Sequence, residues 1–228
     1  MEISFLSGFI ASSVHVLTGP DHLAAVAPVT ARKEKKHWRV GFFWGLGHLF
    51  GMLLLGVLFL AFKEVFPVDK IASASESIVG YILILLGIWV IYKLSKKRGR
   101  HIHKHIHVNE KGETVIHEHS HSHPHEHDSL EGKKLASEWM IFGIGTIHGF
   151  AGVSHLLIML PVLLMENLGD SVLYLSGFVL GTILSMTLFA MVLGLIRNNM
   201  KTGRLLHGFQ LVMGVISIGV GVFWIWSN

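Results

Sequence analysis

The chain has 228 residues and a formal net charge of +4, with 51% hydrophobic and only 15% charged residues. This composition excludes an ordinary soluble domain and is typical of a polytopic membrane protein, and the 25 glycines suit helices that pack closely in lipid. Cysteine is absent, which excludes disulfides, thiolate metal sites and a thiol–disulfide relay, whereas histidine is abundant at 17 residues.

Six stretches of the sequence are long and apolar enough to cross a hydrocarbon core of about 30 Å as helices. They cover residues 3–31, 40–62, 77–94, 139–165, 171–196 and 205–226. The first contains Gly19-Pro20, where we expect the helix to break or kink, because proline lacks the backbone donor and clashes with the preceding turn. The sequence therefore predicts an all-α fold with six transmembrane helices.

Lysine and arginine are concentrated in alternate loops. Residues 32–39 hold five of them and residues 197–204 hold three, and the connector after the third span is basic as well. The loops at residues 63–76 and 166–170 are acidic on balance. Because cytoplasmic loops carry the excess of basic residues, we predict a multi-pass protein of the cell (inner) membrane with both termini outside and the connector in the cytoplasm.

The membrane parts before and after the connector resemble each other. Residues 15–28 and 148–161 share His, Gly, His, Leu and Pro at one offset of 133, and glycines of the third and sixth spans coincide at an offset of 134. Since each copy has three helices, an odd number, the second copy would enter the membrane upside down. We predict two inverted three-helix repeats, residues 1–95 and 139–228, a construction that secondary transporters use with the substrate site where the copies meet.

The polar connector, residues 96–138, carries ten histidines in two alternating tracts. Extended strands would place each tract on one face of a hairpin that turns at residues 109–112, and disorder without metal is the alternative. Such tracts bind late first-row divalent ions, Zn²⁺ among them, with little selectivity. We expect a cytoplasmic metal buffer or sensor, with a solvated linker as the alternative. The ten residues are His101, His103, His105, His107, His117, His119, His121, His123, His125 and His127.

One carboxylate lies well inside the predicted spans. Asp21 has no lysine or arginine there to pair with it, and an unpaired carboxylate in lipid costs about 2.5–3.5 kcal/mol on insertion scales. The expected break at Gly19-Pro20 would bring His15 and His22 close to this carboxylate, and a divalent cation would neutralise its charge. The alternative is a proline kink with a protonated aspartate and a hydrogen-bonded histidine packed among the helices.

Three further histidines extend this candidate metal site. His48 lies on a glycine-rich face of the second span and is the natural additional ligand. His148 and His155 occupy the matching places of the second copy, where Ser154 replaces the carboxylate and Thr182 replaces the third imidazole; packed polar residues are the equal alternative for these two histidines. Imidazoles with few carboxylates and no thiolates suit Ni²⁺, Co²⁺, Zn²⁺ or Cu²⁺ better than Mg²⁺ or Ca²⁺.

The stretch His15-Val-Leu-Thr-Gly-Pro-Asp-His, followed by Gly-Leu-Gly-His48, resembles the nickel/cobalt transporter superfamily, and most of all its six-helix urease-accessory-type nickel permeases. The family's signature is a histidine, four residues, then Asp-His, with a Gly-His in the next helix; here five residues separate His15 from Asp21. The resemblance implies that His15, Asp21, His22 and His48 select the metal. The histidine-rich connector also resembles efflux members of the superfamily, which leaves the direction of transport open.

We therefore predict a secondary permease that moves Ni²⁺ or Co²⁺ by alternating access, with uptake favoured over efflux. No P-loop occurs, and no His-Glu-x-x-His motif lies in the predicted spans, so the protein is predicted not to be an enzyme and to draw energy from a gradient or a partner. We expect no resident cofactor and no nucleic-acid partner; the expected partners are the ion, the bilayer and a cytoplasmic metallochaperone. The alternatives are a metal sensor or membrane chaperone acting through the connector, and a sulfite- or organosulfonate-type anion exporter, which would need positive charge in the spans.

Overall fold

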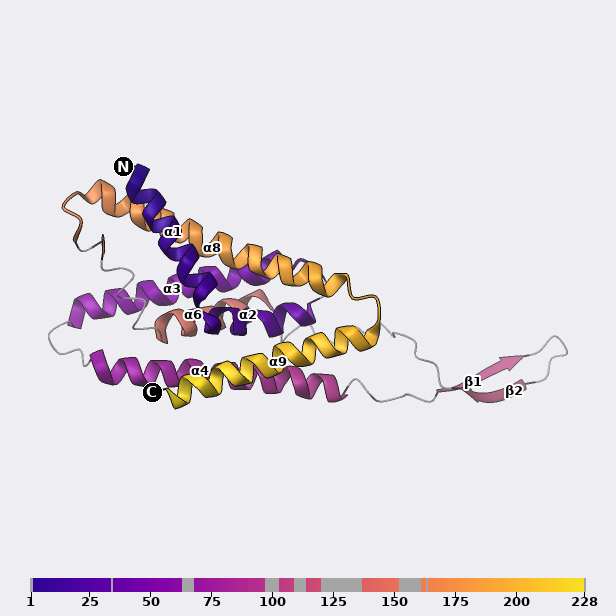
Figure 1. Cartoon of the computed structure of the whole chain (residues 1–228). Coiled ribbons are helices and arrows are strands. Elements are labelled where there is room, and N and C mark those ends of the chain that lie inside the picture. Colours follow the sequence, from indigo (N-terminus) through magenta and orange to yellow (C-terminus); the bar gives the residue numbers. More distant parts are fainter. Residues whose placement is uncertain are drawn as a thin grey trace.

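The computed structural model describes residues 2–33, 35–62, 68–96, 103–108, 114–119, 137–151, 161–162 and 164–227. Its helices are α1 (Glu2–Thr18), α2 (Pro20–Arg32), α3 (Trp38–Phe62), α4 (Val68–Lys96), α6 (Glu138–Ala151), α8 (Leu168–Asn198) and α9 (Gly203–Trp226) (Figure 1). The membrane parts are helical throughout the described residues, as the sequence predicts. The connector adds one antiparallel pair of strands, β1 (His103–Val108) and β2 (Thr114–His119).

Four helices contain stretches long and apolar enough to cross a membrane. They are Trp38–Phe59, Glu76–Ser95, Leu168–Asn198 and Gly203–Trp226. Helices α1 and α2 pass the same test together as one bent span, which raises the number to five. The predicted span at residues 139–165 begins with α6, whose 14 residues are too short to cross alone, and residues 152–160 lie outside the described part of the chain. Six spans therefore stay a prediction.

The predicted break in the first span is confirmed. Helix α1 ends at Thr18, α2 begins at Pro20, and the two axes differ by 68°. Gly19 is the N-cap of α2, and proline fits the first turn because the N–H that it lacks would have had no partner inside the helix. A Cβ at Gly19 would lie 2.5 Å from Nδ1 of His22 and 3.0 Å from Oδ1 of Asp21, so a side chain here would displace both.

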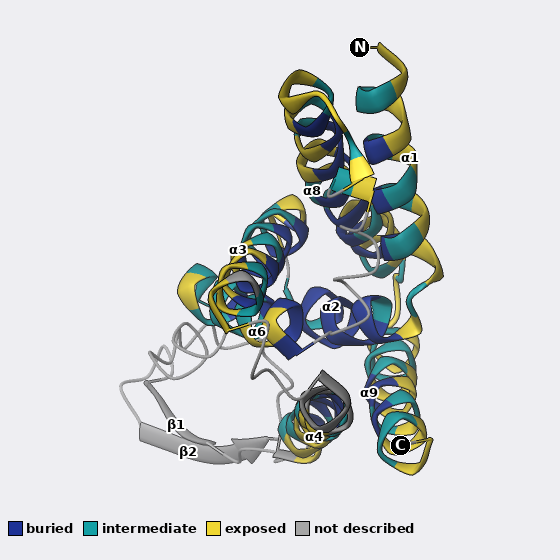
Figure 2. Ribbon diagram, turned by 90° about the vertical axis from the view of Figure 1, so that its left-hand side faces the viewer, coloured by how far each residue is buried: buried dark blue, intermediate teal, exposed yellow. Residues whose placement is uncertain are grey.

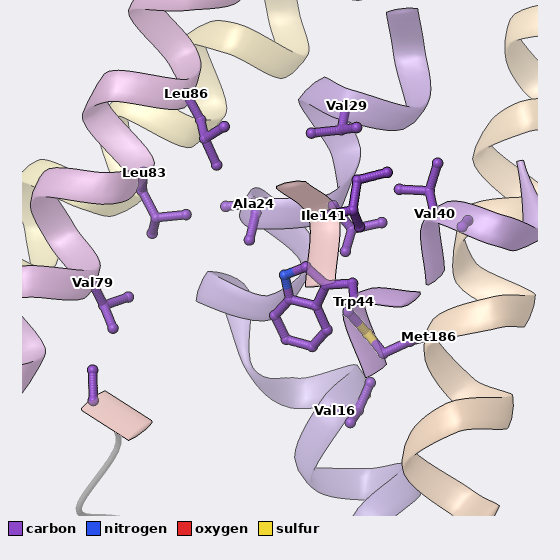
Figure 3. Close-up of a cluster of buried hydrophobic side chains, with 14 residues drawn as sticks. Val16, Ala24, Val29, Val40, Trp44, Val79, Leu83, Leu86, Ile141 and Met186 are labelled. Atoms are coloured by element: carbon purple, nitrogen blue, oxygen red, sulfur yellow. The ribbon is translucent and has the colours of Figure 1, made fainter. Parts of the chain in front are cut away.

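Helix α2 is the buried centre of the helical part. It contacts α1, α3, α4, α8 and α9, and all its residues from Ala24 to Ala31 are buried (Figure 2). Most of these side chains are small, which lets the surrounding helices approach. An apolar cluster packs around it, with Val16, Trp44, Leu83 and Ile141 supplied by four different helices (Figure 3). The first turn of α2, which carries the intramembrane aspartate, therefore lies in protein rather than in lipid.

Glycines allow two parallel helix pairs to touch backbone to backbone. In the pair of α3 with α6, a Cβ on Gly47 would collide with the carbonyl of Phe142. In the pair of α1 with α8, a Cβ on Gly181 would collide with the carbonyl of Phe9. Gly181 lies 134 residues after Gly47, and Phe142 lies 133 residues after Phe9. The two contacts therefore join corresponding positions of the predicted repeats.

Helices α4 and α9 run antiparallel and pack through glycines in the same way. A Cβ on either member of each pair would press against the partner glycine's carbonyl oxygen; the pairs are Gly80 with Gly221 and Gly87 with Gly214. Midway between these contacts, the hydroxyl of Ser217 donates to the carbonyl of Leu83 at 2.8 Å, across a sequence separation of 134. Gly214 lies 134 residues after Gly80, and Gly221 lies 134 residues after Gly87. The repeat offset therefore converts each glycine pair into the other pair.

In the connector, the register of β1 with β2 places histidines opposite one another. His103 pairs with His119 and His105 pairs with His117. Directly opposite residues of antiparallel strands share a face of the ribbon. The predicted turn at residues 109–112 lies outside the described residues, as do five of the ten histidines: His101, His121, His123, His125 and His127.

Replacing Gly221 by Ala should destabilise the protein, because the new Cβ would lie 2.5 Å from the carbonyl oxygen of Gly80 and 2.9 Å from Ile84. Overpacking of this kind typically costs about 1–3 kcal/mol. Gly219→Ala on the same helix is the matched control, since its Cβ would meet nothing within 4 Å. Thermal unfolding of the detergent-purified variants measures the difference; equal midpoints for the two variants would contradict the close contact of α4 with α9.

Candidate metal centre

Four imidazoles and one carboxylate from four helices meet beside the break between α1 and α2. His15 comes from the last turn of α1, Asp21 and His22 from the first turn of α2, His48 from α3 and His148 from α6. The ring of His22 is the middle of the group: the ring centroids of His15 and His48 lie 4.6 and 4.9 Å from it. The ring of His148 lies 4.9 Å from the same centroid.

The group is shielded from the surroundings. His22, His48 and His148 are each at most 1% exposed, and Asp21 is 8% exposed. A buried carboxylate requires compensation by a positive charge or by hydrogen bonds. Its two ion-pairing partners among the described residues are both histidines, so any positive charge they supply depends on protonation of the imidazoles.

Both oxygens of Asp21 are engaged. Oδ1 lies 2.9 Å from Nδ1 of His22, and Oδ2 lies 3.0 Å from Nε2 of His148. An ionised carboxylate only accepts hydrogen bonds, so each of these ring nitrogens must donate its N–H to it. A neutral imidazole has a single N–H, and the carboxylate therefore fixes the tautomers: His22 presents the lone pair of Nε2, and His148 presents that of Nδ1.

The donor atoms form two overlapping sets that share His22. In each set the three ligand atoms lie within 4.8 Å of one another; the sets are His15 with His22 and His48, and Asp21 with His22 and His148. In the second set, the donors already hydrogen-bond one another. The first set consists of imidazoles from three helices. Metal–nitrogen bonds of about 2.0–2.1 Å require only a modest contraction of such a set, so it is the better position for an ion.

Trp44 belongs to the centre although the sequence analysis overlooked it. Its indole stacks on the ring of His48, with centroids 4.9 Å apart and planes 12° from parallel. It also lies 5.5 Å from the ring of His22 and 5.2 Å from that of His148, and it is 1% exposed. It precedes His48 by four positions on α3, a spacing that places both side chains on one helix face and could have revealed it. The indole restricts the orientation of His48 and excludes water from that side.

Close packing of α3 with α6 sets the distance between their histidines. A Cβ on Gly149 would collide with the carbonyl of His48, so this position allows only glycine at the observed approach. At the beginning of both helices, Arg39 and Glu138 form a two-bond ion pair at 2.7 and 2.8 Å. Helices α3 and α6, which carry His48 and His148, are therefore held together both at their beginnings and beside the two histidines.

Five of the six predicted intramembrane ligands converge in this centre: His15, Asp21, His22, His48 and His148. His155 and Ser154 lie outside the described residues. Thr182, which takes the place of His48 in the second copy, is buried and donates its hydroxyl to the carbonyl of Phe178 at 2.9 Å. His22 is hydrogen-bonded to Asp21, as the alternative of a proline kink with packed polar residues also predicts. In His22 that bond engages Nδ1, and Nε2 lies on the opposite side of the ring.

Comparison with known proteins gives a family and three curated relatives. The model of the cytochrome c biogenesis protein transmembrane region matches residues 4–223. Urease accessory protein UreH of Bacillus sp. (strain TB-90) is 30% identical over 96% of this chain and 89% of its own length. The chloroplast proteins FOR GROWTH AND FERTILITY 2 and 1 of Arabidopsis thaliana are 28% and 27% identical over 95% of this chain.

The chain spans about half the length of the two Arabidopsis relatives, 54% and 57% respectively. No solved structure matches. The family match covers nearly all of the chain, and it agrees with the apolar helices described above. The chain is therefore a multi-pass membrane protein and a homologue of UreH that belongs to the family of the cytochrome c biogenesis protein transmembrane region.

Proposed function

We propose that this protein is a secondary permease that carries a late divalent transition-metal ion, Ni²⁺ or Co²⁺, across the cell membrane, with uptake favoured over efflux. The observation that carries the proposal is the meeting of three imidazoles, His15, His22 and His48, beside a buried carboxylate in the interior of a membrane protein. The similarity to UreH agrees with the resemblance of the His15–His48 motifs to urease-accessory-type nickel permeases.

The ligand set favours this class of ion. Three imidazoles without thiolates suit Ni²⁺, Co²⁺ and Zn²⁺, whereas Mg²⁺ and Ca²⁺ prefer sites built from oxygen ligands. Asp21 contributes negative charge next to the ion, and its hydrogen bond to Nδ1 of His22 leaves Nε2 as the nitrogen of His22 that would ligate the ion. Carboxylates that orient a ligating histidine in this way are general in metal sites. Asp21 thus both compensates the charge and positions the central ligand.

The proposal includes six spans arranged as two inverted repeats. Its support is the internal correspondence of contacts: the glycine contacts of α3 with α6 recur between α1 and α8, and those of α4 with α9 map onto one another. A two-fold axis through the bond of Ser217 with Leu83 would produce this pattern, because residues on such an axis contact their own equivalents. His15, Asp21, His22 and His48 then belong to the first copy and His148 to the second, so the centre lies where the copies meet.

This placement suggests how the ion is released. Rocking of the second copy against the first would move His148 away from Asp21 and change the charge balance beside the ion. Nδ1 of His148 is buried and has no hydrogen-bond partner among the described residues, so this nitrogen can receive an ion that leaves the first donor set. The sequence has no nucleotide-binding motif, and the energy would come from a gradient or from a partner protein.

The proposed orientation places the basic loops and the connector in the cytoplasm, with both termini outside. There the alternating histidines would buffer or sense metal ions, Zn²⁺ included, and pass them to a metallochaperone. The backbone register, which pairs His103 with His119 and His105 with His117, supports this role, because histidine-rich tracts of this kind bind divalent ions. The same observation favours the second candidate function, a metal sensor or membrane chaperone that acts through the connector.

The family is described by cytochrome c biogenesis. That description does not indicate thiol chemistry in this particular chain. Haem is attached to c-type cytochromes at cysteine pairs. This chain has no cysteine with which to exchange thiols or disulfides, so we propose ion transport rather than an enzymatic or redox role.

Replacing His22 by Ala should reduce the accumulation of radioactive nickel to the level of host cells that lack the protein, because the residue belongs to both donor sets. His207→Ala is the matched control, since this histidine lies on α9, outside both sets. Uptake is measured at equal membrane abundance in a host without its own nickel transporter. Undiminished accumulation in His22→Ala cells would refute the site, and accumulation below background in the wild type would reverse the direction.

Replacing Asp21 by Asn should weaken Ni²⁺ binding by about 10–100-fold, the usual effect of removing a carboxylate that orients a metal-bound histidine. Asparagine has nearly the same shape, but its NH₂ group cannot accept the second histidine N–H. The measurement is titration calorimetry of the detergent-purified protein, from which residues 100–128 are deleted so that the connector contributes no signal. Wild-type affinity in the Asn variant would show that the carboxylate has no part in binding.

Deleting residues 100–128 discriminates between the two candidate functions. A permease should keep its ion selectivity and most of its transport, because the donor sets of the membrane part are untouched. A sensor or chaperone that acts through the connector should lose all of its activity. Initial rates with Ni²⁺, Co²⁺ and Zn²⁺ in proteoliposomes give the answer, with the full-length protein in parallel.

A further inference from the structure

A second feature of the membrane part is an apolar groove between α4 and α6, distinct from the metal centre. It is an open cavity of about 190 Å³ lined almost entirely by apolar surface. The lining residues are Ile82, Leu85, Leu86, Trp89, Met140 and Ile144. On α4 the lining extends from Ile82 to Trp89, about 10 Å along the helix axis. The groove therefore runs lengthwise along a membrane-spanning helix.

Two hydrogen-bond donors lie at the Trp89 end of the groove, one on this lining residue and one on Arg32, which contacts it. The guanidinium of Arg32 lies over the indole of Trp89, with its carbon 4.9 Å from the ring centroid. No carboxylate of the described residues forms an ion pair with Arg32. The indole N–H of Trp89 is buried and has no acceptor among the described residues. A partly buried cation beside an unsatisfied N–H is costly unless an anion accepts from both.

The donors lie at the level expected for the boundary between membrane and water. Arg32 is the last residue of α2, and Trp89 lies near the end of the span Glu76–Ser95. Tryptophan and arginine are typical of this level, where an apolar body meets polar head groups. From this end the groove continues toward the middle of the span, where Leu85, 65% exposed, borders it. The end beside Arg32 and Trp89 thus suits the head group of a lipid, and the part near Leu85 suits its acyl chain.

We propose that this groove is a binding site for one anionic phospholipid, whose phosphate accepts from Arg32 and Trp89 and whose acyl chain fills the groove. A zwitterionic lipid would bring its own ammonium group next to Arg32, and a free phosphate ion would leave the apolar walls uncovered. The helix of a second copy of this chain would cover the walls, but it would leave the cation and the indole N–H without an acceptor. The anionic lipid satisfies both parts of the site, and the assignment is independent of which ion the protein transports.

The test uses the full-length chain reconstituted into vesicles of equal parts phosphatidylglycerol and phosphatidylcholine. After extraction into mild detergent, native mass spectrometry identifies the lipid that stays bound. The wild type should retain one phosphatidylglycerol in preference to phosphatidylcholine. Arg32→Gln should reduce this preference about fivefold, the usual effect of one basic residue at an anionic membrane surface.

Two further variants separate the head of the lipid from its tail. Trp89→Phe keeps a ring under the guanidinium and removes only the N–H, so it should lower the preference for phosphatidylglycerol in the same direction as Arg32→Gln. Leu85→Trp fills the groove from an exposed position and should reduce retention of both lipids. Arg204→Gln, an exposed basic residue at the start of α9, is the matched control and should change nothing.

Several outcomes would overturn the proposal. Equal retention of the two lipids by the wild type would show that the site does not select charge. An unchanged preference in monodisperse Arg32→Gln protein would show that the guanidinium does not bind the head group. If inorganic phosphate added to the extracted protein displaces phosphatidylglycerol and no lipid is retained, the two donors bind a free anion instead. A dimeric mass without lipid would show that a second copy of the chain covers the groove.

Discussion

The structure depends above all on the burial of one carboxylate inside a membrane protein. Asp21 carries a charge that lipid does not tolerate, and the fold surrounds it with the first turn of α2, with His22 and with His148 from a distant part of the chain. Its position in the first turn of a helix also places it near the positive end of the helix dipole, which stabilises a carboxylate. Among the residues that the structure describes, no lysine or arginine pairs with Asp21. The local charge of the centre consequently depends on imidazole protonation and, in the proposed function, on the bound ion.

The break at Gly19-Pro20 makes this arrangement possible. An unbroken helix would place His15 and His22 about 10 Å apart along one axis, too far to share an ion. With the axes bent by 68°, their ring centroids are 4.6 Å apart. Glycine is required at the bend because a side chain there would occupy the space of Asp21 and His22. The local backbone break at Gly19-Pro20 is therefore what assembles the candidate metal centre.

Glycine contacts decide how closely the helices around this centre approach. In lipid there is little hydrophobic driving force between helices, so packing and direct backbone contact carry the association. The contact of Gly149 with the carbonyl of His48 brings α6 against α3, and this places His148 within reach of Asp21. Family membership does not require this chemistry, since the relatives are named for urease accessory, cytochrome c biogenesis and chloroplast roles. The proposal for this chain rests on its own imidazoles and on its lack of cysteine.

The sequence by itself determined what is local. The lengths of the apolar stretches located four of the predicted spans and the bent first one, because crossing a membrane requires a minimum number of helical residues. The missing N–H of Pro20 located the break, and the isolated charge of Asp21 located the centre. His48 and His148 were identified as candidates by their positions, but the sequence left open whether they act together.

The tertiary structure decided which groups face one another. The bond of Asp21 with His148 joins residues 127 positions apart, and the stacking of Trp44 on His48 surrounds the centre with a ring that no motif had indicated. The position of Arg32 over Trp89 is likewise a contact between two helices. Spacing along one helix fixes relative positions only within that helix. Distances between helices follow from packing, which depends on every contact at once and cannot be read from any single segment.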